Sequence, residues 1–145
     1  MRHFAHGRPL EGRHVYLAGP RTSLDPEAYA QLESDLLALG VVEQPVAAAF
    51  AAAVRALRAY GATVSTPFEI DQQDWAGMRH ARAGRERDAQ ALESADLVAV
   101  LDGWEDVPGA VDAAVIVAET RDVPWTRVSA VLASCAELAQ VRGAA

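Results

Sequence analysis

The sequence predicts one α/β domain, a three-layer, doubly wound arrangement around a mainly parallel sheet of about four or five strands. Three observations favour this class. Short apolar runs alternate with longer stretches of helical periodicity, and glycine or proline marks most of the junctions between them. The chain has 145 residues, of which 51% are hydrophobic and 23% charged, which is enough for one buried core. Since no linker divides the pattern, we expect a single domain over residues 1–145, with 1–12 as a flexible N-terminus.

The first half of the pattern is a strand, two helices and a second strand. Residues 14–18 are a short apolar run closed by glycine and proline, which is typical of a buried strand. The stretch 25–39 starts with Asp-Pro and is followed by glycine, as helices often are. Apolar residues at helical spacing predict a second helix over 46–60, again followed by glycine. A strand over 62–66 ends before Pro67.

The second half alternates helices and strands in the same way. The run Asp96-Leu-Val-Ala-Val-Leu-Asp102 is the strongest strand in the sequence. The stretch 68–84 has no clear period and is left unassigned. The other expected elements are a short helix over 85–94, a helix over 110–120, a strand over 123–128 and a terminal helix over 130–141.

Strands joined by helices form parallel crossovers of the flavodoxin-like or Rossmann-like kind, which bind ligands outside the carboxyl ends of the strands. Three loops therefore face the expected site: 19–23, 67–74 and 103–112. This expectation depends on topology alone.

Composition and charge narrow the possible partners. The formal charge is −7 and all 13 basic residues are arginine, so we expect no nucleic-acid binding, which depends on phosphate neutralisation. With one cysteine, no apolar run of membrane-spanning length and no secretory signal, a cytoplasmic location without membrane attachment is expected. The histidines lack metal-ligand spacing, so we expect neither a metal nor another cofactor.

The loop 103–112 contains the strongest candidates for catalytic residues. It places Glu105, Asp106 and Asp112 between a buried strand and a helix. Two carboxylates at a strand end can divide the work of catalysis, one as nucleophile and one as proton carrier. The alternative interpretation is that Asp106 only caps the following helix.

Weaker signals lie in two places. Arg21, Thr22 and Ser23 follow the first strand and could hold a phosphate, although an ordinary turn with a solvated arginine explains them as well. Trp104 could stack on a base, or it could pack in the core.

The order and spacing of four motifs resemble the nucleoside 2-deoxyribosyltransferase superfamily, in particular its small bacterial and phage branch. These motifs are Tyr16-Leu-Ala-Gly-Pro20, then Phe50-(x)6-Leu57 continuing to Pro67, then Asp88-(x)7-Asp96-Leu-Val-Ala-Val-Leu, then Gly103-Trp-Glu-Asp-Val-Pro-Gly109. The likeness covers most of the chain from His14 to Trp125. The helix expected over 25–39 looks like an insertion.

The resemblance implies a retaining displacement at an N-glycosidic bond, in which a carboxylate attacks the anomeric carbon and a second acid helps the base to leave. Carried over residue by residue, it assigns the nucleophile to Asp112, the acid that contacts the base to Asp88, and the polar residue six positions before the nucleophile to Asp106. Together with the loops above, it suggests substrate contacts at Tyr16, Gly19, Pro20, Arg21, Ser23, Pro67, Trp104 and Gly109.

One departure from the family pattern bears on activity. The family nucleophile is glutamate, and Asp112 is shorter by one C–C bond, roughly 1.5 Å. The leading hypothesis is an enzyme, a nucleoside deoxyribosyltransferase or nucleotide N-glycosidase, acting on a (deoxy)nucleoside or a nucleoside 5′-monophosphate. The alternative is a catalytically silent nucleotide sensor on the same fold. Either way, the resemblance favours a homodimer or higher homo-oligomer.

Overall fold

A single parallel sheet organises the chain. The structure, a computed structural model, describes residues 8–20, 26–66, 89–107 and 110–144. In these ranges four strands pair in the order β2-β1-β3-β4. Their bounds are β1 His14–Ala18, β2 Thr63–Ser65, β3 Leu97–Val100 and β4 Trp125–Arg127. Every pairing is parallel, which confirms the predicted doubly wound, Rossmann-like α/β class.

The two central strands form the floor of the core. Val15 and Leu17 of β1 are fully buried, as are Ala99 and Val100 of β3. The register places Ala18 opposite Val100, so β1 and β3 end side by side. The connections from β1 to β2 and from β3 to β4 run outward in opposite directions from this pair. The junction of β1 and β3 is therefore the topological switch point, where doubly wound sheets bind ligands.

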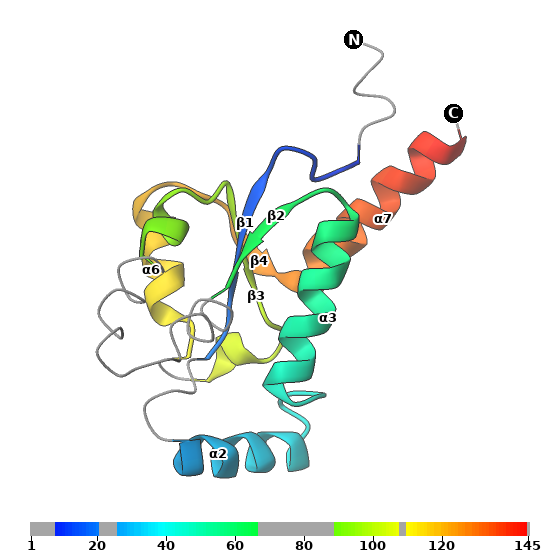
Figure 1. Cartoon of the computed structure of the whole chain (residues 1–145). Coiled ribbons are helices and arrows are strands. Elements are labelled where there is room, and N and C mark those ends of the chain that lie inside the picture. Colours follow the sequence, from blue (N-terminus) through cyan, green and yellow to red (C-terminus); the bar gives the residue numbers. More distant parts are fainter. Residues whose placement is uncertain (1–7, 21–25, 67–88, 108–109, 145) are drawn as a thin grey trace, which may run out of the picture.

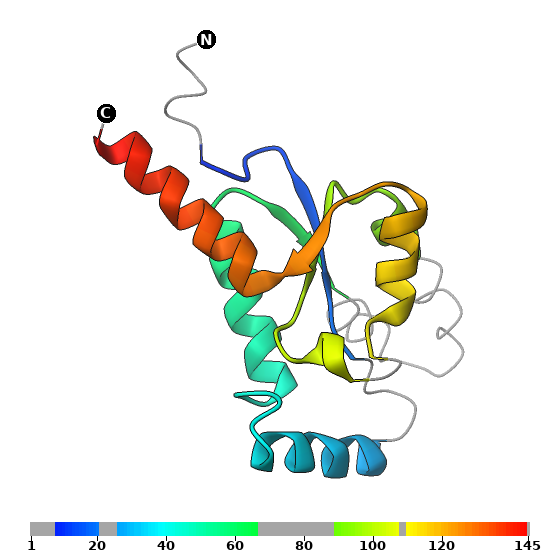
Figure 2. The same cartoon turned by 180° about the vertical axis from the view of Figure 1, so that it is seen from behind.

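Helices cover both faces of the sheet. Figures 1 and 2 show α3 (Val46–Ala59) and α7 (Val128–Ala144) on one face and α6 (Asp112–Thr120) on the other. The apolar face predicted for α3 is confirmed, since Val46, Phe50, Val54 and Leu57 are all buried.

Helix α2 (Pro26–Ala38) lies beyond the carboxyl edge, the edge of the sheet at which the parallel strands end (Figure 1). Its Leu36 is buried against the body of the domain. Glu33 reaches the next helix, where its Oε2 accepts a hydrogen bond of 3.1 Å from the backbone N–H of Val46. The carboxylate satisfies an N–H at the start of α3 that has no partner within that helix.

Several expected bounds shift in the structure. Helix α6 begins at Asp112 and not at Ala110, while α7 begins at Val128, two residues before the expected start. The expected short helix over 85–94 is described only from residue 89 onward, and 89–93 is helical.

Part of the N-terminal stretch 1–12, expected to be flexible, packs against the domain. Leu10 is buried, and its backbone N–H donates a 2.8 Å hydrogen bond to the carbonyl oxygen of Tyr60. Beside it, Glu11 accepts hydrogen bonds from the exposed side chain and backbone of Arg8, and these lower the pKa of its carboxyl group. Residues 1–7 lie outside the described ranges.

The opposite, amino edge of the sheet is fastened by side chains. The His14 ring bridges two serine hydroxyls, with Nε2 2.8 Å from Ser65 Oγ and Nδ1 3.1 Å from Ser94 Oγ. Asp96 Oδ2 accepts a 2.8 Å hydrogen bond from the backbone N–H of His14. Asp96 therefore has a structural role at the start of β3.

Candidate functional site

The loop after β3 is held in place by a glycine and a tryptophan. Leu101 and Asp102 leave the strand, Gly103 turns the chain, and a 3-10 helix, η2 (Trp104–Asp106), follows. Gly103 has a φ of +89°, and a Cβ at this position would clash with the backbone carbonyl of Val41. Only glycine combines this left-handed conformation with so close an approach. The loop after α2 therefore packs directly on the loop after β3.

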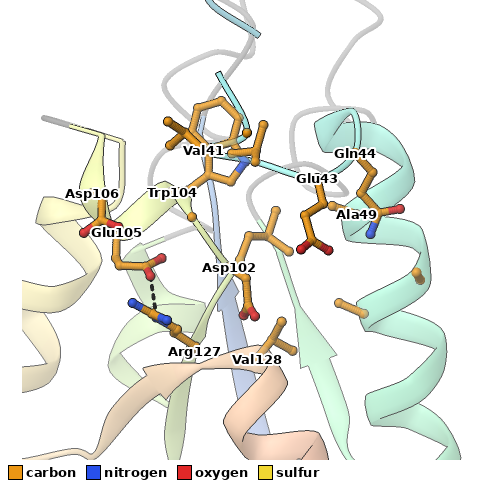
Figure 3. Close-up of a pocket in the computed structure, with 16 residues that line it drawn as sticks. Val41, Glu43, Gln44, Ala49, Asp102, Trp104, Glu105, Asp106, Arg127 and Val128 are labelled. Atoms are coloured by element: carbon orange, nitrogen blue, oxygen red, sulfur yellow. Dashed lines mark ion pairs between the residues drawn. The ribbon is translucent and has the colours of Figure 1, made fainter. Parts of the chain in front are cut away.

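A pocket of about 410 Å³ opens between these two loops at the carboxyl edge (Figure 3). Its volume lies within the range of small-molecule sites. One wall is apolar, from the alanines of α3 and from Val41 and Val42; the opposite wall carries charged groups. The lining residues are Gly40 to Gln44, Ala49, Ala52, Ala53, Leu101 to Asp106, Arg127 and Val128.

Glu105 and Arg127 form an ion pair in the charged wall of the pocket. Glu105 Oε1 lies 2.5 Å from Arg127 Nε, joining η2 to the last residue of β4 (Figure 3). The Glu105 side chain is only 12% exposed, whereas that of Arg127 is 58% exposed. The contact lacks hydrogen-bond alignment, and neither carboxylate oxygen of Glu105 has a hydrogen-bond partner among the described residues.

Asp102 has a structural bond as well as a place in the pocket. Its Oδ1 accepts a 3.1 Å hydrogen bond from the backbone N–H of Ser129, in the first turn of α7. The carboxylate thus caps α7 from another element and stabilises the positive end of the helix.

Two of the predicted site residues line the pocket, Trp104 and Asp106. Asp106 is exposed. Trp104 is only 1% exposed and belongs to the hydrophobic core. Most of its side chain therefore packs in the core, as the second interpretation of this residue states. The helix-cap interpretation of Asp106 does not fit, because the N-cap of α6 is Val111 and, among the described residues, no side-chain cap hydrogen bond is formed there.

Asp112 occupies a different position. It is the first residue of α6 and is exposed, but it is not part of the pocket lining. Figures 1 and 2 place α6 on the face of the sheet opposite α3, whose alanines form the apolar pocket wall. Asp106 is the last residue of η2 and Asp112 the first residue of α6, so the two lie at opposite ends of the connection between these elements.

The remaining predicted residues are either buried or outside the described ranges. Tyr16 lies within β1 and is only 3% exposed, and Gly19 and Pro20 are buried just beyond the strand end. The expected contributions of Arg21, Ser23, Pro67, Asp88 and Gly109 fall outside the described residues.

Sequence reasoning missed three charged residues of the pocket: Glu43, Asp102 and Arg127. Asp102 and Arg127 could have been found, because each lies at the carboxyl end of an expected strand, where ligand contacts concentrate. Glu43 follows a helix that looked like an insertion, and no local pattern singles it out.

Metal and membrane features can be assessed for the described ranges. There, no three histidine, cysteine or acidic side chains are grouped so that they could hold a metal ion. None of the helices in the same ranges combines the length and apolar character needed to cross a bilayer.

Comparison with known proteins adds no further constraint on the site. No protein-family model matches the chain, and no curated protein or solved structure matches it.

Proposed function

We propose that this protein cleaves or transfers the N-glycosidic bond of a (deoxy)nucleoside or nucleoside 5′-monophosphate, with the Asp112 carboxylate as nucleophile. One observation carries the proposal: Asp112 is an exposed carboxylate at the first residue of α6, the helix that follows central strand β3 at the carboxyl edge. Doubly wound sheets bind ligands outside this edge at the switch point. The first turn of a helix also favours a negative side chain electrostatically.

The chemistry would run in two balanced steps. A carboxylate oxygen of Asp112 bonds to the anomeric carbon as the C–N bond breaks, and the bond electrons leave with the base, which takes a proton from an acid. Asp106 or Asp88 would supply that proton. A second base or water then attacks the anomeric carbon, the ester bond to Asp112 breaks, and the released proton restores the acid.

The length of the nucleophile gives the most specific test. The aspartate side chain is shorter than the glutamate side chain of the resembled family by one C–C bond, roughly 1.5 Å. A misplacement near 1 Å can cost about a hundredfold in rate. We therefore expect Asp112→Glu to keep or raise the rate, and Asp112→Ala to lower it by at least about a hundredfold.

The experiment incubates purified protein with a panel of 2′-deoxynucleosides and their 5′-monophosphates, and measures released base by liquid chromatography, with and without an acceptor base. Glu137→Ala serves as the matched control, since it removes an exposed carboxylate from α7 on the other face of the sheet. Base release that is equal in wild type and Asp112→Ala contradicts the assignment of the nucleophile.

The sensor alternative has its own signature. A silent binder is stabilised by nucleotides through mass action without consuming them. A nucleotide-dependent rise in Tm with no base release, even at high protein concentration, would support the sensor and refute the enzyme.

A further inference from the structure

The pocket beside Trp104 shares only Asp106 with the proposed reaction centre. It opens on the face of the sheet covered by α3 and α7, whereas Asp112 begins α6 on the opposite face. Its apolar wall includes the α3 alanines, whose short side chains leave space for an occupant. A cavity with one apolar wall and a few polar groups is the usual form of a small-molecule site.

The charges of this pocket are strongly unbalanced. Four carboxylates line it, from Glu43, Asp102, Glu105 and Asp106, against the single guanidinium of Arg127. Glu105 already pairs with that guanidinium. The other three carboxylates are exposed and have no cationic partner within the lining. Figure 3 shows the Glu43 and Asp102 carboxylates directed into the same space.

Glu105 gives an independent indication. Both of its carboxylate oxygens are buried, and no described residue donates a hydrogen bond to them. A buried carboxylate without hydrogen bonds is costly, so groups that donate to it are favoured. Among the described residues its counter-charge is Arg127, which is 58% exposed and therefore has room to move aside.

We propose that this pocket binds a small organic cation, an ammonium or amidinium group carried on an apolar body. The cationic head lies between Glu43 and Asp102, within reach of Glu105 when Arg127 swings outward, and the apolar body packs on the α3 alanines. The site does not depend on glycosidic chemistry and stands or falls separately from the proposed function.

The test uses three probes of nearly equal shape: benzylammonium, benzyl alcohol and benzoate. Each is titrated into ¹⁵N-labelled protein at low ionic strength while the backbone amide shifts of Asp102, Gly103 and Val128 are followed. Benzylammonium is expected to shift these amides with a Kd in the millimolar range normal for so small a molecule, and added salt should weaken it. Benzyl alcohol and benzoate should shift the same amides far less.

Two substitutions should change the affinity in opposite directions. Glu43→Gln removes an attracting charge and should weaken benzylammonium binding by about two- to fivefold, whereas Arg127→Gln removes a repelling charge and should strengthen it by a similar factor. Glu137→Gln on α7 is the matched control and should leave the Kd unchanged.

The contrary outcomes are distinct. Preferential binding of benzoate that is lost in Arg127→Gln would identify an anion site and overturn the proposal. Equal binding of all three probes would show that the charges do not select the ligand, and would overturn it too. If Arg127→Gln does not fold, the salt dependence and Glu43→Gln still decide the matter.

Discussion

Gly19 lies where the backbone passes very close to two core side chains. A Cβ at this position would lie 2.5 Å from Phe50 Cζ and 2.9 Å from Leu101 Cδ1. We expect Gly19→Ala to lower the free energy of unfolding by about 1–3 kcal/mol, because inserting a methyl group into a packed core forces its neighbours apart. Urea denaturation followed by circular dichroism measures the change.

A double-mutant cycle provides the control. Phe50→Leu creates space beside position 19, so its cost should be smaller in the Gly19→Ala background than in the wild type. Strictly additive effects would mean that the alanine methyl group does not press on Phe50.

Cys135, the one cysteine of the chain, is buried in α7. Burial raises the pKa of its thiol, so less of the reactive thiolate is present at a given pH. We expect Ellman's reagent to react slowly with the native protein at pH 8 and rapidly once urea unfolds it.

The neighbouring position tests whether burial is the cause. Ser134 is exposed on the same helix, so a Cys135→Ala/Ser134→Cys variant should react rapidly in the native state. Rapid reaction of wild-type Cys135 without denaturant would contradict a buried thiol.

Among the elements, α7 shows how a helix start can depend on a distant residue. Asp102 Oδ1 accepts the backbone hydrogen bond of Ser129. Asp102→Ala should cost about 0.5–2 kcal/mol of stability, in the range of lost N-caps, and Asp102→Asn should cost less because it keeps an acceptor oxygen. Thermal unfolding of the two variants checks the order; an unchanged Tm in Asp102→Ala would show that the cap contributes nothing.

Helix bounds also show what local sequence can and cannot predict. The ends of α2 and α3 were predicted well because glycine follows each of them, and Gly40 and Gly61 both adopt positive φ. The start of α7 was placed too late because its capping group, Asp102, lies 27 residues away in sequence. Such a partner becomes visible only when β3 and β4 are paired.

For the molecule as a whole, stability depends on the two central strands. Leu17 of β1 is fully buried in the core. Leu17→Ala should reduce the free energy of unfolding by about 2–5 kcal/mol, a large share of the roughly 5–15 kcal/mol of a typical domain. Chemical denaturation measures it, with Leu39→Ala as control, because Leu39 is 76% exposed and should lose little. Similar losses at both positions would contradict the position of the core.

The sequence pattern predicts the fold of the whole molecule, whereas it does not predict the pocket. Alternating strand and helix patterns specify the layers, and parallel topology specifies the edge where ligands bind. The pocket, however, is assembled from the loop after α2, the side of α3, the loop after β3 and the end of β4. Of these walls, only the loop containing Trp104 and Asp106 had a pattern of its own. The other three acquire meaning once tertiary packing brings them together.

Helix α2, which lies beyond the carboxyl edge, has a consequence for the cooperativity of unfolding. Of its described side chains only Leu36 is buried, whereas α3 buries five residues against the sheet. Segments with few buried contacts open in local events that leave the rest folded. In hydrogen–deuterium exchange, α2 amides should therefore exchange well before those of α3, and identical protection would show that both helices belong to one cooperative unit. If α2 exchanges first, the helix beyond the carboxyl edge opens and closes many times while the rest of the molecule stays folded.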